Sequence, residues 1–338
     1  MENLGLVGFT GAGANRLFSA LTGLPAPSEY EAAVGIATVP DERLDRLAAM
    51  SESKKVVPAG FELVHLALPP GAKPGEGLGT KFLGALRNTD ALLIVLRAFE
   101  DAGVEPDADG DLAAIELELV IADVASVEGR LERQRKALKA RDPQVIAEVG
   151  ALERAYPILS EGTPLFRAQL SVEDRELLAP AFLLTVKPTL VVCNTGEQSG
   201  AAAPIEGALA VPIDIEAEIA AIEPRERAEM RGMYGVVESA LDQVARAAYH
   251  LLGRRTFLTT GDKESRAWTF RAGAKAPECA GVIHSDLQRG FIRAEVIRWD
   301  ELLDIGSWSK ARDAGKLRVE GKDYEVADGD VLEIRFNV

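Results

Sequence analysis

The chain has 338 residues, of which 47% are hydrophobic and 27% charged, and its formal net charge is −15. This composition is that of a folded, soluble protein and excludes a disordered one, and the length suggests roughly two or three domains. The acidic balance argues against unselective binding to polyanions, because proteins that bind in this way are usually basic.

No targeting segment is visible in the sequence. The N-terminus enters an apolar run directly, and no apolar run approaches the length of a membrane span. The two cysteines, Cys193 and Cys279, are far apart and lack the spacing of metal ligands, which fits a reducing compartment. We therefore expect a cytoplasmic protein.

The first candidate site follows the apolar run Leu4–Val7, which we predict to be a strand. Gly8–Asn15 is a glycine-rich turn and residues 16–21 a helix, and this order is the setting of a loop that holds phosphate through backbone N–H groups. The frame G-x-x-x-x-G is intact at Gly8 and Gly13. The candidate phosphate-binding residues are Gly8, Thr10, Gly11, Ala12, Gly13, Ala14, Asn15 and Arg16.

The two positions after this frame lack the side chains that phosphoryl transfer uses. A working P-loop continues with a lysine, which reaches the β- and γ-phosphates, and with a serine or threonine, which binds Mg²⁺. Here these positions are Ala14 and Asn15. Arg16 is a basic residue two positions after the frame, and it either replaces the lysine or points away along the helix.

The rest of the first hundred residues alternates between helical and extended patterns. Residues 22–40 look irregular, 41–50 and 82–87 helical, and 62–68 and 91–96 extended, with a loop rich in glycine and proline at 69–79. Strands that alternate with helices predict a doubly wound α/β sheet.

A helical hairpin interrupts this pattern. Residues 111–139 read as one long helix, Arg141-Asp142-Pro143 breaks it, and 144–156 returns as a second helix. Basic side chains gather at the turn between the two helices: Arg130, Arg133, Arg135, Lys136, Lys139 and Arg141. This cluster is either a solvated helix tip or a contact for RNA or the ribosome.

Residues 189–256 return to the α/β pattern, with strands at 189–193 and 209–213 and a helical region at 216–252. From residue 257 the pattern changes to a small α+β domain, with strands at 267–270, 294–297, 324–326 and 331–336 and helices near 280–288 and 309–314. This part has 13 basic and 15 acidic residues, so it could approach RNA without a large electrostatic cost.

Four segments resemble the YchF / Obg-like ATPase family of translation-factor P-loop proteins. They are Val39–Asp45, which is similar to the family's VPDPRLD; Gly75–Gly79 with Phe82, Leu83 and Arg87, which is similar to GEGLG-x-x-FL; Lys187–Thr189 leading to Asn194 and Glu197; and the stretch from Arg266 to Val338, which is similar to the family's TGS domain.

The resemblance implies an α/β fold: a P-loop G domain with a mostly parallel sheet, an inserted antiparallel helical arm and a C-terminal β-grasp (TGS) domain. The G domain would span 1–110 and 171–256, the arm 111–170 and the TGS-like domain 257–338. The family reads a base with NxxE rather than NKxD, which implies ATP or ADP as cofactor and Asn194 and Glu197 as base-binding residues.

The departures from the family gather around the phosphates. Besides Ala14 and Asn15, the family's DxxG falls at His65–Leu68, where both functional residues are lost, and its Mg²⁺-binding threonine has no counterpart. Ile213 and Asp214 stand where small residues are expected, although Glu216 is retained. We therefore expect no catalytic residues, no Mg²⁺ site and a packed rather than a catalytic His65.

Our interpretation is a pseudo-ATPase of this family, with weak or no binding of purine nucleotide, that acts by binding the ribosome or a translation partner. Two alternatives remain: an active ATP- or GTP-hydrolysing enzyme with an unusual phosphate site, and a sensor that binds adenine nucleotide without hydrolysis. Asn194 and Glu197 are the residues that distinguish whether a base is bound. Ala14 and His65 are those that distinguish whether nucleotide is hydrolysed. We expect no membrane or DNA partner, and a monomer.

The C-terminal domain carries a second set of candidate contacts for RNA or the ribosome. They are His284, Arg289 and Arg293, which need not be buried in a β-grasp core. The alternative is that this domain keeps its residues for packing alone, which would account for the apolar positions Trp268, Val282, Ile292 and Ile334.

Overall fold

The computed structural model describes residues 2–68, 77–137, 142–198, 200–223, 225–235 and 238–337, without the side chains of 136, 137 and 228. The chain divides into two compact units, one of residues 1–36 and 62–244 and the other of residues 37–61 and 245–338. The domain boundaries expected at 110, 170 and 256 stay predictions. Across the described ranges, no helix is both long and apolar enough to cross a membrane.

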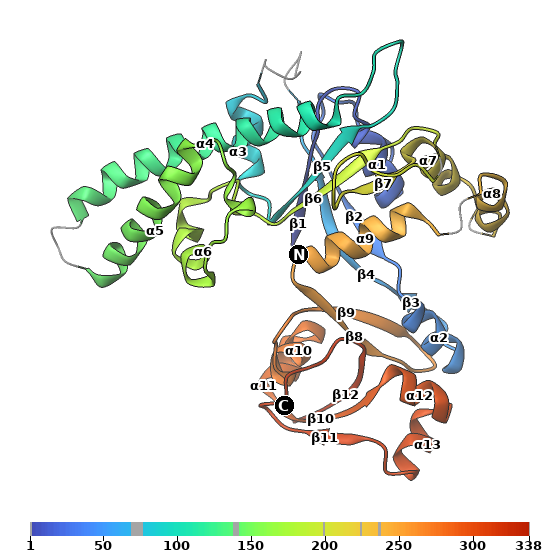
Figure 1. Ribbon diagram of the computed structural model, residues 1–338. Coiled ribbons are helices and arrows are strands. Elements are labelled where there is room, and N and C mark those ends of the chain that lie inside the picture. Colours follow the sequence, from blue (N-terminus) through green and yellow to red (C-terminus); the bar gives the residue numbers. More distant parts are fainter. Residues whose placement is uncertain are drawn as a thin grey trace. The chain divides into compact units, whose positions relative to one another are not determined.

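The first unit is built on a six-stranded, mostly parallel sheet in the order β2-β4-β1-β5-β6-β7 (Figure 1). Its strands are β1 (Asn3–Val7), β2 (Ala33–Val39), β4 (Ala59–His65), β5 (Ala91–Arg97), β6 (Thr189–Asn194) and β7 (Leu209–Val211). Strand β1 pairs in parallel with β4 and β5, and β6 continues the sheet beside β5. Six of the seven residues of β5 are buried, as expected for a strand covered on both faces.

The helices of this unit are α1 (Ala14–Thr22), α3 (Thr80–Leu86), α4 (Ala108–Ala137), α5 (Pro143–Ser160), α6 (Val172–Leu178), α7 (Ile213–Ala221), α8 (Arg227–Met233) and α9 (Ala240–Leu251), the last of which continues into the second unit. Side chains of α3 and of the first turns of α4, including Phe82, Leu86 and Ile115, pack against Leu92 and Ile94 of the sheet. The predicted doubly wound α/β fold is confirmed.

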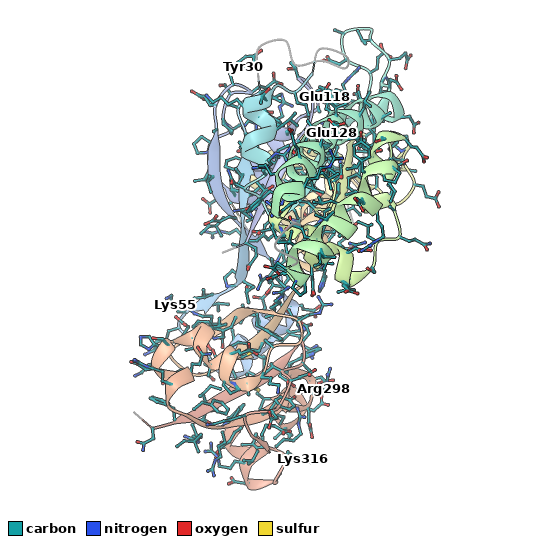
Figure 2. The ribbon with its side chains drawn as sticks, turned by 90° about the vertical axis from the view of Figure 1, so that its left-hand side faces the viewer. Tyr30, Lys55, Glu118, Glu128, Arg298 and Lys316 are labelled. Carbon is teal, nitrogen blue, oxygen red and sulfur yellow. The ribbon has the colours of Figure 1, made fainter. Side chains whose placement is uncertain are left out.

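The hairpin of α4 and α5 is the predicted helical arm, and this prediction is confirmed. It has an apolar core of its own, formed by residues such as Val127, Leu152 and Leu159. The Tyr156 hydroxyl donates a hydrogen bond to the Glu128 carboxylate over 2.7 Å, which joins the two helices. Glu128 is among the side chains labelled in Figure 2. Because the helices share a core and polar contacts, the arm is a packed element rather than a single projecting helix.

The structure corrects three boundaries predicted for this unit. Residues 22–40 are not all irregular, since β2 lies within them as an edge strand, with Val34 and Ile36 exposed and Ala37 and Val39 buried. The strand predicted at 209–213 ends at Val211, because Pro212 has no N–H to continue the ladder. Residues 216–252 are not one helical region, since α7, α8 and α9 are separate helices.

The second unit contains a six-stranded mixed sheet in the order β11-β10-β12-β8-β9-β3. Its strands are β3 (Val56–Val57), β8 (Arg254–Thr259), β9 (Ser265–Arg271), β10 (Phe291–Arg298), β11 (Arg318–Glu320) and β12 (Asp330–Phe336). Its helices are α2 (Glu42–Met50), α10 (Ala276–Ile283), α11 (Ser285–Arg289), α12 (Trp299–Ile305) and α13 (Trp308–Asp313). The parallel pair β8–β12 lies between antiparallel partners, and α10 packs on the sheet through Cys279 and Ala280, which is the predicted β-grasp arrangement.

Three predictions for this unit need correction. The strand expected at 324–326 is an isolated bridge between Lys275 and Glu325, while β8 and β11 were not anticipated. Two residues assigned to a packed core are not in it, since 43% of Val282 and 55% of Ile292 is exposed. Packing in the core of this unit therefore does not account for these two apolar residues.

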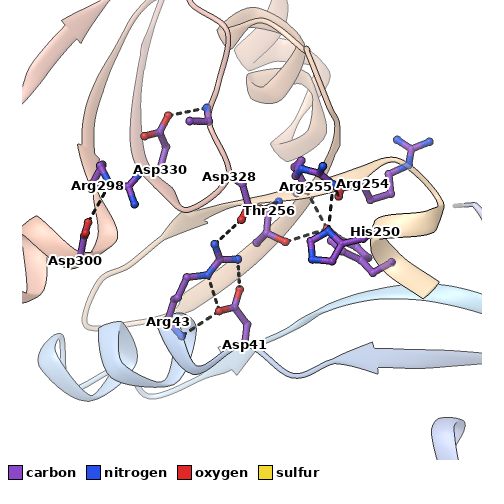
Figure 3. A network of polar contacts seen from close by, with 12 residues as sticks. Asp41, Arg43, His250, Arg254, Arg255, Thr256, Arg298, Asp300, Asp328 and Asp330 are labelled. Atoms are coloured by element: carbon purple, nitrogen blue, oxygen red, sulfur yellow. Dashed lines mark hydrogen bonds and ion pairs between the residues drawn. The ribbon is translucent and has the colours of Figure 1, made fainter. Parts of the chain in front are cut away.

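The segment that resembles VPDPRLD forms a polar network inside the second unit (Figure 3). Asp41 caps α2 by accepting a hydrogen bond from the Arg43 N–H, and its carboxylate also binds the Arg43 guanidinium. The same guanidinium donates to Asp328 over 2.6 Å, and Asp328 accepts from the Thr256 N–H. Burial acts to lower the pKa of Arg43, but Asp41 and Asp328 together raise it, so the group stays charged.

Candidate functional site

The glycine-rich turn has the backbone shape of a phosphate-binding loop. Gly11 and Gly13 have φ values of 85° and 91°, in the left-handed region that favours glycine. A Cβ atom on Gly13 would lie 2.6 Å from Asn194 Nδ2, and one on Gly8 would lie 2.8 Å from the Val95 carbonyl oxygen. The loop is therefore fixed by close backbone packing, and α1 begins directly after it at Ala14.

A cavity of about 360 Å³ opens at this loop. Its described lining comprises Gly11, Gly13, Asn15, Arg16, Glu29, Phe99, Asp101, Asn194 and Asp214. Of the other predicted loop residues, Gly8 and Ala12 are buried and Thr10 is exposed. The structure thus brings half of the predicted phosphate loop and Asn194 to one cavity, together with Asp214 and with Glu29 and Asp101, which the sequence did not indicate.

The basic side chain at this cavity is paired. Arg16 forms an ion pair with Asp214, the residue that stands where the family has a small one. The described lining then contains three carboxylates, on Glu29, Asp101 and Asp214, against one guanidinium. Like charges repel, so the net charge of this lining opposes the binding of a polyphosphate.

Glu29 contacts the loop directly. Its carboxylate accepts a hydrogen bond from the Gly11 N–H over 2.9 Å. Backbone N–H groups of such loops are the donors that bind phosphate. One of these donors is therefore already satisfied by a carboxylate of the same chain.

The two residues predicted to bind the base lie in different surroundings. The Asn194 amide donates to the Ala12 carbonyl oxygen over 3.0 Å and accepts from the Gly196 N–H over 2.9 Å, so it ties the end of β6 to the glycine-rich loop. Asn194 is only 2% exposed and still lines the cavity. Glu197 is exposed in the following turn. Base contact by these residues stays a prediction.

His65 is a packed residue, as the sequence predicted. It is 3% exposed on β4, its ring lies edge-on to Phe18, and its Nδ1 is 2.9 Å from the Glu31 carbonyl oxygen. Burial lowers its pKa, with the Glu31 hydrogen bond opposing this shift. Because a carbonyl oxygen can only accept, Nδ1 donates in this contact, which holds the ring against the turn that carries Glu31.

The residues present do not fit the Mg²⁺ ion that a P-loop ATPase uses. An asparagine amide replaces the hydroxyl at residue 15, and the imidazole at residue 65, in place of a carboxylate, is engaged with Glu31. Within the described part of the chain, no group of three or more His, Cys, Asp or Glu side chains could hold a metal ion.

The retained Glu216 has a structural contact. This carboxylate is 1% exposed and accepts hydrogen bonds from the Ser239 hydroxyl and the Ala240 N–H, at the start of α9. Burial raises its pKa, while these hydrogen bonds act in the opposite direction. It therefore joins α7 to α9 and does not belong to the cavity lining described above.

The basic residues of the arm are in part engaged within it. Arg130 pairs with Glu148, and the Arg133 guanidinium donates to the Gly129 carbonyl oxygen. Arg133 and Arg135 are exposed on α4, which also includes the backbone of Lys136. Lys139 and Arg141 lie outside the described residues, as do Gly75 and Glu76 of the GEGLG-like stretch.

The C-terminal candidates differ in their surroundings. The His284 ring accepts a hydrogen bond from the Asp286 N–H and so caps α11, and Arg289 pairs with Asp286 within the same helix. Arg293 is exposed on β10. Local structure therefore accounts for His284 and Arg289, whereas Arg293 presents its side chain to solvent. Their contact with RNA stays a prediction.

Known proteins are similar to this chain in both sequence and fold. Residues 255–337 match the family model YchF-GTPase_C, described as "Protein of unknown function (DUF933)". The chain is 40% identical to the ribosome-binding ATPase YchF of Bacillus subtilis (strain 168) and 38% identical to that of Escherichia coli O157:H7, each time over 99% of both chains. Its structure is similar to that of the Schizosaccharomyces pombe YchF GTPase, with a TM-score of 0.87 and 29% identity over 99% of this chain and 97% of that one. With such relatives over its whole length, the chain belongs to the YchF family.

Proposed function

We propose that this protein binds the ribosome and acts by that binding rather than by hydrolysing nucleotide. The first half of the proposal follows from the family, whose bacterial relatives are named for ribosome binding and span the same length. The exposed Arg133 and Arg135 of the arm and Arg293 of β10 are the side chains that we assign to contact with ribosomal RNA.

The second half follows from the phosphate cavity. Phosphoryl transfer depends on positioning and on neutralising charge at the phosphates. The chain has Ala14 and Asn15 where these groups belong, and the nearby Arg16 is neutralised by Asp214. This paired arginine, in a lining with more carboxylates than cations, is the observation that carries the proposal.

A weak adenine-nucleotide site is the second candidate, and it is favoured by one observation. Gly13 and Asn194 still line the same cavity, so a backbone donor for phosphate and an amide for a purine edge remain close together. We propose that ATP or ADP binds here weakly and without Mg²⁺. Such a nucleotide would act as a signal and not as a substrate.

The test compares ribosome binding with hydrolysis in one preparation. The full chain is sedimented with ribosomes after nucleotide removal, and again with ATP or ADP, and phosphate release is followed in parallel. We expect pelleting without nucleotide and no phosphate release above a control without enzyme. A change in pelleting when ATP or ADP is added would support the second candidate. An ATPase rate that persists through repurification, or pelleting that requires ATP, would contradict the proposal.

A further inference from the structure

The turn that carries Glu29 contacts both the glycine-rich loop and the segment that follows β4. On one side, the Glu29 carboxylate accepts the Gly11 N–H over 2.9 Å. On the other, the Glu29 carbonyl oxygen accepts the Leu68 N–H over 2.8 Å. Leu68 stands where the family has the glycine of DxxG, and it is 8% exposed. A single residue thus links the glycine-rich loop with the segment that follows β4.

Three further hydrogen bonds fix this turn. The His65 ring is 2.9 Å from the Glu31 carbonyl oxygen through its Nδ1. Within the turn, the Ser28 N–H donates to the Glu31 carboxylate and the Glu31 N–H donates to the Ser28 carbonyl oxygen. Because the turn is closed on itself and held to β4, the position of the Glu29 carboxylate is set by more than its own hydrogen bond.

We infer that Glu29 is an internal ligand of the glycine-rich loop, which occupies the anion position at Gly11 and holds the loop and the segment after β4 together without nucleotide. A carboxylate and a phosphate oxygen accept the same N–H donor, so they compete for it, and a bound phosphate would also lie against the negative charge. The inference rests on the proposed function, since it explains how the site keeps one arrangement without hydrolysis.

The direct test measures the affinity for inorganic pyrophosphate by isothermal titration, without Mg²⁺ and at constant ionic strength. Glu29→Gln keeps the length of the side chain and a neutral acceptor, whereas Glu29→Ala removes both the acceptor and the charge. Asp101→Asn is the matched control, because it removes one carboxylate from the same cavity. We expect binding to tighten at least about tenfold in Glu29→Ala, less in Glu29→Gln, and by at most about threefold in Asp101→Asn, since an exposed charge is screened.

A second measurement separates a direct contact from net charge. In the wild type without nucleotide, the Gly11 amide should exchange slowly with solvent in ¹H–¹⁵N spectra, because its N–H is hydrogen-bonded to the Glu29 carboxylate. This protection should fall in Glu29→Ala and persist in Asp101→Asn. The Leu68 amide should stay protected in both variants, because its acceptor is the backbone carbonyl oxygen of residue 29.

Either of two results would overturn the inference. In the first, Glu29→Ala binds pyrophosphate no more tightly than the wild type. In the second, Asp101→Asn gains as much affinity as Glu29→Ala, so that only net charge matters. Neither result touches ribosome binding, which is judged separately by sedimentation of the wild type, so failure of this inference is distinguishable from failure of the proposed function.

Discussion

Individual side chains around the cavity determine what its backbone can bind. The loop glycines keep the conformation that presents N–H groups to an anion, yet Glu29 is bonded to one of these groups and Arg16 is paired with Asp214. The preserved shape and the altered chemistry are therefore properties of different atoms. A glycine frame in a sequence therefore predicts the backbone shape of the loop but not the charged side chains around it.

At this scale we predict a pH dependence that originates at His65. Burial lowers the pKa of this histidine in the folded protein, so between that lowered value and the ordinary value of about 6.5 the unfolded chain binds more protons. Stability should therefore fall as the pH is lowered through this window, and the loss should be smaller in His65→Gln. Urea unfolding between pH 7.5 and 5.5 measures it. An identical pH dependence in wild type and His65→Gln would show that the buried imidazole is not the titrating group.

Among the elements, α2 is held in the second unit in part by one guanidinium. Arg43 binds Asp41 at the start of the helix and Asp328 before β12. We predict that Arg43→Ala lowers the free energy of unfolding by about 2 kcal/mol, because two carboxylates lose a charged hydrogen-bond donor. Chemical denaturation measures the change.

Arg46→Ala provides the comparison on the same helix. Arg46 is exposed and lies over the ring of Trp299, so its loss should cost about 0.5–1 kcal/mol. If both substitutions had equal and small effects, the network in Figure 3 would be a surface feature without consequence for stability.

The glycine-rich loop allows a gain-of-function prediction. Ala14→Lys combined with Asn15→Ser restores the residues that contact phosphate and Mg²⁺ in P-loops. A desolvated charge contact is worth on the order of 2–5 kcal/mol, so ATP should bind at least about tenfold more tightly when Mg²⁺ is present. Titration calorimetry measures the affinity.

Ala14→Gln with Asn15→Ser separates charge from size, and it should give little gain. An unchanged affinity in the lysine variant would mean that side chains fill the cavity. Addition of Glu29→Ala to that variant would then be the decisive comparison.

The elements that were predictable share a strong local signal. Strands β1, β5 and β6 are continuous apolar runs and were found, as was the hairpin of α4 and α5 with its Asp-Pro break. Strands β2, β3 and β11 are short or lie at a sheet edge, where exposed residues weaken the pattern. Glu29 contacts Gly11, which is 18 residues away in the chain, and it lies in a stretch without periodicity. No local sequence pattern could therefore predict this contact.

For the whole molecule, the proposed contact with the ribosome should depend on salt. Phosphate contacts by arginine and lysine release counterions, so pelleting should fall steeply between about 50 and 200 mM salt. We predict that Arg133→Glu with Arg135→Glu weakens pelleting, and that adding Arg293→Glu weakens it further, because two linked sites reinforce each other.

Glu132→Gln with Glu153→Gln is a control that alters charge on the arm without removing a cation. Equal pelleting of all variants would exclude these arginines as contacts.

Point substitutions suit this test better than a truncation. A chain that ends before residue 257 would cut β8, which begins at Arg254, and would leave residues 37–61 without the rest of their unit. Loss of binding by such a chain would report misfolding as readily as a missing contact.

The second unit is assembled from residues 37–61 and 245–338, and this separation limits when it can fold during synthesis. Arg43 leaves the ribosome long before Asp328, which is 285 residues further along the chain. At about 5–20 residues per second, α2 waits on the order of 15–60 s for its partners. During this time the apolar face of Leu44 and Leu47, buried in the finished protein, has no second unit to cover it. The apolar face of α2 therefore stays uncovered until its partners β9 and α12 have been made.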